Sequence, residues 1–396
     1  MQNPIYFDHA ATTPLDRRVL EEMMPWLTDH FGNASSVHQA GQTAKVALEE
    51  SRESVADILN VKPSEVIFTS GGTESNNAAI KGLFFAAKNQ ETTNRTEIIT
   101  SEAEHNAVRQ TAEALKAHGA TVIFLQPDSF GRISPKQVSD AIGEHTALVS
   151  IMHVNNELGS VNPIEEIAGV CHEKGVPFHS DCVQSAGKIP LDLGRAGPDL
   201  ASLSGHKFYG PKGTGVLVVR EGVDWASWMH GGSQERGRRG GTSNVLGIVG
   251  LRKALEIAQE QMDADHAHCQ ALRTRVLEKL DQKLPGQYQL NTPPERVIPH
   301  ILNLRFNPSP GQTFDGEMLL LNLDIEGVCV SNGSACTSGA VEPSHVLTAI
   351  GLESTLANAS VRISFGRGNR PEEADLFVEK LERVLKRMST LNQPIT

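Results

Sequence analysis

The sequence has few cysteines and no long hydrophobic run. Its 396 residues include five cysteines, none of them in a C-x-x-C pair: Cys171, Cys182, Cys269, Cys329 and Cys336. They are too few and too scattered for the disulfide framework of a secreted domain, so we expect reduced thiols. The longest apolar runs, such as 83–87 and 216–219, are far shorter than the roughly 18 residues that a membrane helix needs, so we expect no membrane-spanning segment.

Basic residues are also scarce. The chain has 36 Lys and Arg against 47 Asp and Glu, a formal net charge of −11, and no long basic run. Because affinity for nucleic acids depends on clustered positive charge, we expect neither DNA nor RNA as a partner. Residues 1–9 contain neither the basic region nor the apolar region of a secretory signal, so we expect a cytoplasmic protein.

The chain is long enough to divide into two domains. Between about residues 64 and 219, short β-branched runs alternate with amphipathic segments, which predicts an α/β fold with a mostly parallel sheet covered on both faces. The predicted strands are 66–69, 98–100, 122–125, 148–154, 176–180, 200–203 and 216–219. The predicted helices between them include 74–87, 105–118 and 164–174.

A long helical pattern at 245–284 predicts a connecting helix. The elements predicted after it belong to a smaller α+β domain, with strands at 301–306, 328–330 and 361–365 and helices at 314–323 and 371–388. We therefore predict an N-terminal arm (1–14) that packs on the small domain, a large domain (15–260) and a small C-terminal domain (261–396).

Lys207 follows a predicted strand inside a turn rich in Gly and Ser, Ser202-Leu-Ser-Gly-His-Lys-Phe-Tyr-Gly. A lysine with the usual pKa of ~10.4 is neutral only about one time in a thousand at neutral pH, so a nucleophilic role requires enclosure or a neighbouring charge. Such a lysine is understandable if it holds pyridoxal phosphate (PLP) as a Schiff base, and the pyridine nitrogen of that cofactor needs a carboxylate. Asp181 ends a predicted strand and is the candidate for this carboxylate. Considered alone, Lys207 could instead be a solvated loop lysine.

Two further features suit this cofactor. Gly71-Gly72-Thr73 joins a predicted strand to a helix N-terminus, where backbone N–H groups can bind a phosphate, although a plain turn would look the same. His105 opens a predicted helix, where an imidazole could stack on the ring and transfer protons near neutral pH. A purely structural histidine is the alternative.

Cys336 lies among Gly, Ser, Ala and Thr residues, whereas Cys329 lies in the apolar run Val-Cys-Val and is assigned to the core. A thiol with a reference pKa of ~8.5 is already a few per cent thiolate at pH 7, so Cys336 could act as an exposed nucleophile on a mobile loop. An unreactive surface thiol is the alternative.

Eight motifs between about residues 5 and 370 together resemble the cysteine desulfurases of the NifS/IscS type, within the class V aminotransferase superfamily of PLP enzymes. They are Asp8-His-Ala-Ala-Thr-Thr-Pro, Ser70-Gly-Gly-Thr-Glu-Ser-Asn, Glu104-His-Asn, Met152-His-Val-Asn-Asn-Glu-Leu-Gly, Asp181-Cys-Val-Gln, Ser204-Gly-His-Lys, Arg239-Gly-Gly-Thr and Gly333-Ser-Ala-Cys-Thr-Ser. Asn332 departs from the serine that the family pattern has at that position. The resemblance implies PLP-dependent fold type I, with PLP in the large domain and the nucleophile loop in the small one.

The resemblance also implies a role for each matching residue. For PLP these are Lys207 (Schiff base), Asp181 (ring nitrogen), Gln184 (ring hydroxyl), His105 (stacking and acid/base catalysis), Gly72, Thr73, Ser204 and His206 (phosphate), Asn156, and Thr242 of the neighbouring subunit (phosphate). Asn156 and Arg362 would hold the carboxylate of L-cysteine. Cys336 would take the sulfur as a persulfide, leaving L-alanine, and pass it to an acceptor in iron–sulfur cluster assembly or other sulfur trafficking. A homodimer without a metal is implied.

Two other functions remain open. A selenocysteine lyase or a class V aminotransferase would use the same cofactor, but a transaminase has no need for Cys336 in a polar loop. A catalytically inactive scaffold would keep the fold only, and the retention of Lys207, Asp181, His105 and Cys336 disfavours it.

Overall fold

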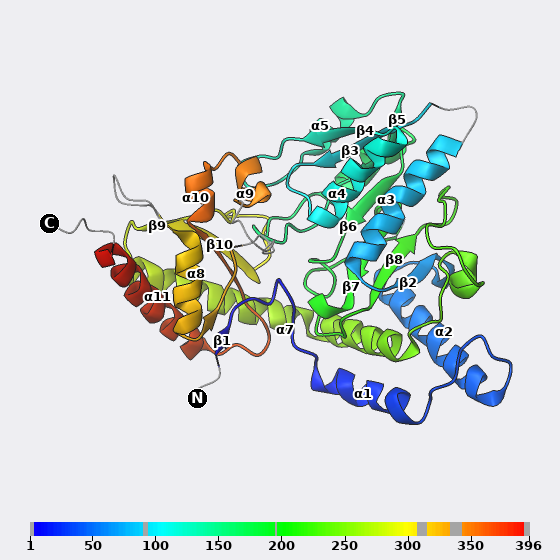
Figure 1. Ribbon diagram of the computed structural model, residues 1–396, viewed down its shortest axis with the longest axis horizontal. Coiled ribbons are helices and arrows are strands. Elements are labelled where there is room, and N and C mark those ends of the chain that lie inside the picture. The colour runs from blue at the N-terminus through cyan, green and yellow to red at the C-terminus, as the bar shows by residue number, and fades with distance from the viewer. Residues whose placement is uncertain (1–3, 90–93, 195, 307–314, 333–342, 392–396) are drawn as a thin grey trace.

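The computed structural model describes residues 4–89, 94–194, 196–306, 315–332 and 343–391. These residues form a larger lobe around a seven-stranded sheet and a smaller lobe around a three-stranded sheet, with α7 running along both (Figure 1). Among the described residues, no helix combines the length and apolarity that crossing a membrane requires.

The seven-stranded sheet has the order β2-β8-β7-β6-β5-β3-β4. Its strands are β2 (Val66–Thr69), β3 (Glu97–Ser101), β4 (Thr121–Leu125), β5 (Thr146–Ser150), β6 (Phe178–Asp181), β7 (Leu200–Ser204) and β8 (Gly215–Val219). Only β8 runs antiparallel to its neighbours, β2 and β7. The predicted α/β class with a mostly parallel sheet is confirmed, and β5 ends four residues before the predicted end at 154, where the chain turns into the loops above the sheet.

Both faces of this sheet are buried except along the edge strand β4, which explains why most of its strands are rich in apolar residues. Neighbouring residues point to opposite faces, so Ile67 and Leu217 belong to one core while Phe68 and Val216 belong to another. α3 (Gly72–Asn89) and α4 (Asn106–Leu115) cover the first face (Figure 1). The second face is covered by α1 (Arg17–Thr28), α2 (Gln39–Leu59), α6 (Ile164–Glu173) and the first half of α7, with α5 (Pro135–Ala141) beside α6.

The smaller lobe contains the antiparallel sheet β12-β10-β9 and the parallel pair β1-β11. Its elements are β9 (Tyr288–Leu290), β10 (Ile301–Phe306), α8 (Gly316–Ile325), β11 (Val328–Cys329), α9 (His345–Ala349), α10 (Ser354–Asn358), β12 (Ser360–Ser364) and α11 (Pro371–Leu391). β1 (Ile5–Tyr6) comes from the N-terminal arm, and Ile5 and Phe7 pack in the core of this lobe.

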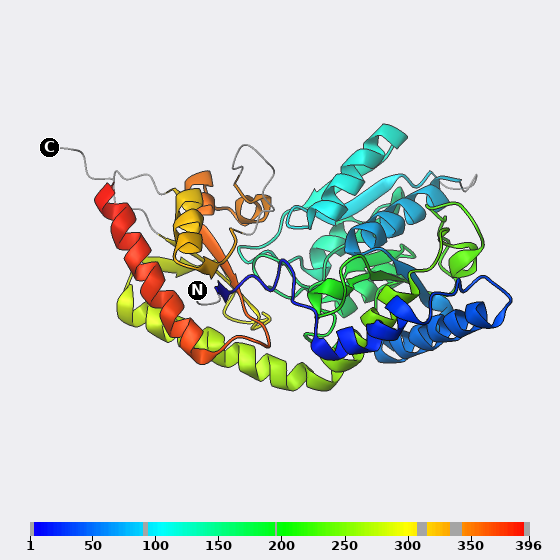
Figure 2. The ribbon, with the colours of Figure 1, turned by 60° about the horizontal axis from the view of Figure 1, so that its bottom comes forward.

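α7 (Val245–Lys283) joins the two lobes, as the pattern at 245–284 predicts (Figure 2). Its first half packs in the core of the larger lobe through residues such as Leu251 and Leu255, and its second half packs in the smaller core through Leu272 and Val276. The predicted boundary at 260/261 falls inside this helix, between the residues of the two cores.

Candidate active site

A cavity of about 570 Å³ lies at the carboxyl ends of the parallel strands, where both lobes and the N-terminal arm meet. Ligand sites of open α/β sheets lie at this edge. All but two of the predicted site residues line it: Gly72, Thr73, His105, Asn156, Asp181, Gln184, Ser204, His206, Lys207 and Arg362. The two others are Thr242 and Cys336.

Lys207 ends the short helix η3 (Gly205–Lys207) directly after β7. Its Nζ donates hydrogen bonds to the carbonyl oxygens of Ala10 (2.7 Å) and Ala11 (2.8 Å) in the N-terminal arm. Burial, followed by the charge of Arg362, lowers the pKa of Lys207 to about 8, although Asp181 favours the protonated form. The enclosure that a nucleophilic lysine requires is therefore present.

Asp181 ends β6, and its carboxylate is held by two hydrogen bonds. Oδ2 accepts from Asn76 Nδ2 (2.6 Å) and Oδ1 accepts from the backbone N–H of Val183 (3.0 Å). Asn76 lies on α3 and is buried, yet its Oδ1 has no hydrogen-bond partner among the described residues. Sequence reasoning gave Asn76 no role, although it closes the motif that begins at Ser70; its position four residues after Gly72, on the same face of the helix, was the available signal.

The N-terminus of α3 forms one end of the cavity. Gly72 is its first residue, and a Cβ there would lie 2.7 Å from Cγ2 of Val183, so only glycine fits without displacing that side chain. Glu74 in the first turn is paired with Arg239 (2.9 Å) and accepts from the N–H of Ser70 (2.7 Å), so its negative charge is compensated. The free N–H groups and the helix dipole therefore favour an anion at this end.

His206 and His105 contribute neutral imidazoles to the cavity. Burial lowers the pKa of His206 to about 4, and its Nδ1 forms a 3.1 Å hydrogen bond with Thr12 Oγ1. His105 caps α4, because its Nδ1 accepts from the N–H of Ala107 (3.0 Å); the proton of the neutral ring is therefore on Nε2. Its ring is solvent-accessible in the cavity, and enclosure by the protein lowers its pKa, while Asp181 opposes this shift.

Arg362 on β12 brings a buried guanidinium to the cavity. Nη2 donates to Oδ1 of Asp8 (2.8 Å) and Nη1 donates to the carbonyl of Asn156 (3.0 Å). Nε of Arg362 and Oδ1 of Asn156 are buried without a partner among the described residues. An unsatisfied guanidinium N–H favours an anionic ligand, and an arginine fork binds a carboxylate well. Asp8, which belongs to the first quoted motif, was not given a role from the sequence.

Glu157 is a second residue that sequence reasoning missed. It lines the cavity, and burial raises the pKa of its carboxyl to about 7 despite the nearby Arg362. Ser344 Oγ donates to its Oε2 at 2.5 Å. Ser344 directly precedes α9, so this hydrogen bond attaches α9 to the loop after β5.

The structure does not bring Thr242 into the cavity, and Cys336 lies outside the described residues. Thr242 is exposed, three residues after Arg239. On either side of residues 333–342, Ser331, Asn332 and His345 line the cavity. Described residues on both sides of the segment with Cys336 therefore line the cavity.

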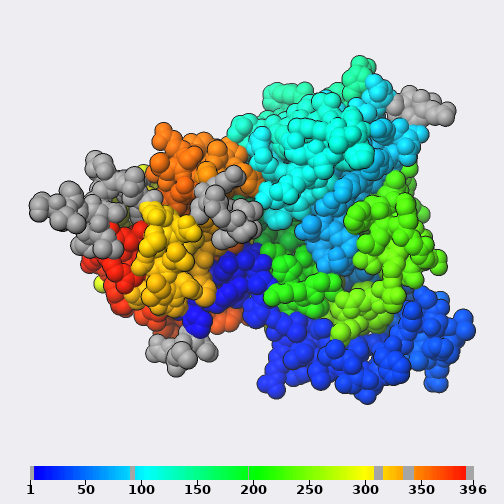
Figure 3. Space-filling view, viewed as in Figure 1, coloured from blue at the N-terminus to red at the C-terminus, as the bar shows by residue number. Residues whose placement is uncertain are grey.

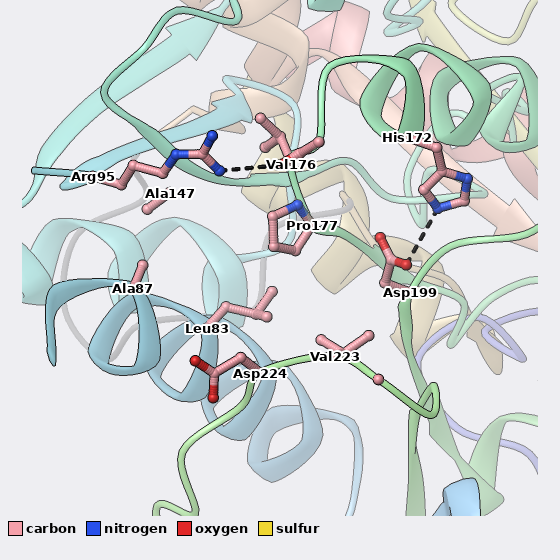
Figure 4. A pocket seen from close by; sticks show the side chains of 12 residues that line it. Leu83, Ala87, Arg95, Ala147, His172, Val176, Pro177, Asp199, Val223 and Asp224 are labelled. Atoms are coloured by element: carbon pink, nitrogen blue, oxygen red, sulfur yellow. Dashed lines mark hydrogen bonds and ion pairs between the residues drawn. The ribbon is translucent and has the colours of Figure 1, made fainter. Parts of the chain in front are cut away.

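A second hollow, of about 320 Å³, lies near the amino ends of the parallel strands, away from the first cavity (Figure 4). Its polar contacts are internal: His172 Nε2 lies 3.2 Å from Oδ1 of Asp199, and Arg95 donates to the carbonyl of Gly175 (3.0 Å). None of the predicted site residues lines it. The chemistry is therefore assigned to the cavity at the carboxyl edge.

The described residues of the cavity fit PLP. They supply an amine of lowered pKa (Lys207), a buried carboxylate (Asp181) and a helix N-terminus with a glycine that leaves room for an anion (Gly72). These groups match the aldehyde, the ring nitrogen and the phosphate of the cofactor.

Comparisons with known proteins agree with this geometry. Residues 5–377 match the family model "Aminotransferase class-V". The cysteine desulfurase IscS of Dictyoglomus turgidum is 42% identical over 392 residues, which cover 99% of this chain and 97% of that protein. A solved NifS-like protein superposes with a TM-score of 0.88 at 37% identity, covering 97% of this chain and 100% of its own. The structure "SspA in complex with cysteine" superposes with a TM-score of 0.79 at 39% identity, covering 91% of this chain and 99% of its own.

Proposed function

The chain belongs to the aminotransferase class-V family, and on that premise we propose that it is a PLP-dependent cysteine desulfurase. It converts L-cysteine to L-alanine, holds the sulfur as a persulfide on Cys336 and transfers it to an acceptor. One observation carries the proposal: Lys207, Asp181 and Arg362 line a single cavity to which both flanks of the segment with Cys336 also contribute.

The cofactor is assigned to the residues of the larger lobe and the arm. Lys207 would hold the cofactor through its aldehyde, Asp181 would pair with the ring nitrogen, and Gln184 would donate to the ring hydroxyl. The phosphate is assigned to the N-terminus of α3 and nearby side chains: Gly72, Thr73, Ser204 and His206. When bound, PLP supplies an electron sink that stabilises negative charge on the α-carbon of an amino acid.

The substrate is oriented by its carboxylate. Arg362 is fixed by Asp8 and by the carbonyl of Asn156, and its Nε–H remains available. A guanidinium held in this way binds a carboxylate in one orientation, which an ammonium group cannot enforce. His105 is placed to move protons through Nε2, because its Nδ1 is occupied by the N–H of Ala107.

Cys336 performs the sulfur transfer. Its thiolate attacks the sulfur of the bound cysteine, so that a sulfur–sulfur bond forms as the carbon–sulfur bond breaks. The electron pair of the broken bond stays with the substrate carbon, which is then protonated to give alanine. The persulfide on Cys336 is the species passed to the acceptor, a protein of iron–sulfur cluster assembly or of another sulfur-trafficking route.

The active unit is a homodimer in the cytoplasm. Large apolar side chains along α1, the segment after it and α2 are 42–91% exposed, more than isolated surface residues account for: Leu20, Met24, Leu27, Phe31, Val37 and Val46. α1, the segment after it and α2, to which these residues belong, lie along one edge of the larger lobe (Figure 3). Thr242 is exposed, and in the dimer it reaches the phosphate site of the neighbouring subunit.

The test is to supply the purified protein with cysteine. The wild type should be coloured by its cofactor and should release alanine, and sulfide when a reductant is present. Cys336→Ser should keep the colour and yield almost no alanine or sulfide. Mass spectrometry should find one extra sulfur on Cys336, with Cys329→Ala as the control for the neighbouring thiol. A persulfide on another cysteine, or full activity of Cys336→Ser, would overturn the proposal.

A further inference from the structure

Lys188 is a buried lysine that the reaction described above does not use. It lies on the turn after β6, and 8% of its surface is exposed. Its Nζ donates a hydrogen bond of 2.6 Å to Oε1 of Gln184. Among the described residues it has no carboxylate partner.

The surroundings of Lys188 disfavour a positive charge. Burial, together with Lys207 and Arg362, lowers the pKa of Lys188 to about 7. Lys188 and the histidines His9 and His300 line one small cavity, and burial lowers the pKa of both imidazoles, that of His9 to about 4. Lysine is almost never fully buried without an ionic partner, because desolvation of its ammonium is costly. A role beyond packing would account for its presence.

The hydrogen bond from Lys188 holds one end of the Gln184 amide. The other end is held by the carbonyl of Ala10, which accepts from Gln184 Nε2 at 2.8 Å. A carbonyl can only accept, so the amide nitrogen lies toward Ala10 and the amide oxygen toward Lys188. The second N–H of Nε2 has no acceptor in the described part of the chain, and Gln184 lines the catalytic cavity.

The same carbonyl connects this pair to the catalytic lysine. Ala10 O accepts from Lys207 Nζ (2.7 Å) as well as from Gln184. Lys207 would have fewer N–H groups with a cofactor on its nitrogen, so the hydrogen bonds at Ala10 would change. The contact between Lys188 and Gln184 does not involve Lys207, and it can hold the amide through the change.

We propose that Lys188 is a positioning residue that fixes the Gln184 amide so that its free N–H faces the ring hydroxyl of PLP. The inference rests on the proposed function, because that hydroxyl belongs to the cofactor.

The experiment is a double-mutant cycle on the apoenzyme, which is titrated with PLP. The variants are Lys188→Met, which keeps a long side chain but no donor, Gln184→Ala, and the two combined. Each single substitution should weaken PLP binding about threefold to tenfold, the loss expected for one hydrogen bond, and should shift the visible absorption maximum of the loaded protein. The double variant should bind no more weakly than Gln184→Ala, because Lys188 acts through Gln184.

Ser185→Ala is the matched control. Ser185 is buried on the same turn, and its Oγ donates to the carbonyl of Cys182 (3.0 Å) rather than to Gln184. This variant should bind PLP as the wild type does. An equal loss in Ser185→Ala would mean that any disturbance of the turn weakens binding, and the proposal would be wrong.

The outcomes separate this inference from the proposed function. A wild type that does not bind PLP contradicts the proposed function. If the wild type binds PLP and Lys188→Met binds it equally well, only the role of Lys188 is overturned. The same holds if the loss of PLP affinity in the double variant equals the product of the losses in the two single variants. If Lys188→Met does not fold, Lys188→Arg replaces it. This variant keeps a donor, so its affinity for PLP and its absorption maximum must match those of the wild type.

Discussion

At the level of single side chains, the site depends on what encloses Lys207. Its amine hydrogen-bonds to two backbone carbonyls of the arm and lies near Arg362, and both burial and that charge lower its pKa. Carbonyl partners hold the amine without the full negative charge that would stabilise its protonated form. The amine therefore becomes neutral closer to physiological pH than an ordinary lysine does.

This pKa predicts the pH dependence of cofactor loading. Only the neutral amine of Lys207 bonds to PLP, so the rate of uptake by the apoenzyme should rise with pH and level off above about 8. An unperturbed lysine would continue to gain reactivity up to about pH 10.4. Stopped-flow measurement of the visible absorption gives the rate, and Lys207→Ala should show no such absorption. A rate that still rises tenfold per pH unit above pH 9 would contradict the lowered pKa.

Arg362 makes a second prediction at this scale. Arg362→Lys keeps the charge but loses the planar fork, so it should raise KM for cysteine by about tenfold or more, with a smaller effect on kcat. Steady-state kinetics of alanine formation provide both constants. Arg305→Lys, on the adjacent strand β10, is the control and should leave KM unchanged. Equal KM values for the two variants would remove Arg362 from substrate binding.

The roles of single residues were predictable where the side chain's own chemistry suits the cofactor, and unpredictable where the residue acts only by contacting another side chain. Lys207, Asp181 and His105 follow strands or open helices, and the ends of parallel strands meet at one edge. Asn76 and Glu157 act through contacts that exist only after folding, with Asp181 and with Ser344. Both residues lie inside quoted motifs, but the motifs alone do not show which side chains these two residues contact.

At the level of elements, the short helix η4 (Gln234–Gly237) contains a strained turn. Glu235 and Arg236 have φ angles of 45° and 59°, a left-handed conformation that is unfavourable for residues other than glycine. The buried carboxylate of Glu235 accepts from Arg52 (2.7 and 3.0 Å) and from the N–H of Phe68 (3.0 Å). These bonds fix the segment that leads to Thr242.

Glu235→Ala should therefore lower the free energy of unfolding by about 3 kcal/mol or more, because it leaves the guanidinium of Arg52 buried without its main partner. Urea denaturation measures the change. Glu49→Ala is the matched control: Glu49 also bonds to Arg52 (3.3 Å), but its side chain is 41% exposed, so the loss should be below about 1 kcal/mol. Similar losses in the two variants would show that burial of the pair does not matter.

The sequence predicted every strand of the large sheet and missed two helices near the N-terminus. All seven strands of the large sheet were predicted, because most of them are buried on both faces and rich in apolar residues. β4 is only partly buried and β6 is largely polar, but each lies between predicted helices or turns. α1 and α2 were not predicted. The buried side of α2 consists largely of small or polar residues, such as Gly41, Ala44 and Ser51, which pack closely without an apolar stripe.

At the level of the whole molecule, the exposed apolar edge formed by α1 and α2 predicts association. Leu27→Glu, at a position that is 55% exposed, should shift the dimer toward monomer at micromolar concentration and should weaken PLP binding, because Thr242 then has no neighbouring phosphate site. Sedimentation velocity measures the shift. Leu321→Glu, 51% exposed on α8 in the other lobe, is the control and should leave association unchanged. A fully active monomer would contradict the shared site.

The N-terminal arm connects the two ends of the chain to the catalytic centre. Its β1 pairs with β11, Ala10 N–H donates to Ser364 Oγ (2.8 Å) across 354 residues of sequence, and the carbonyls of Ala10 and Ala11 accept from Lys207. Residues this far apart in sequence meet late in folding, because closing the intervening loop is entropically costly. During synthesis the arm leaves the ribosome long before its partners in β11 and β12, since 354 positions separate Ala10 from Ser364. A nascent chain therefore cannot complete the environment of its reactive lysine until β11 and β12 have also been translated.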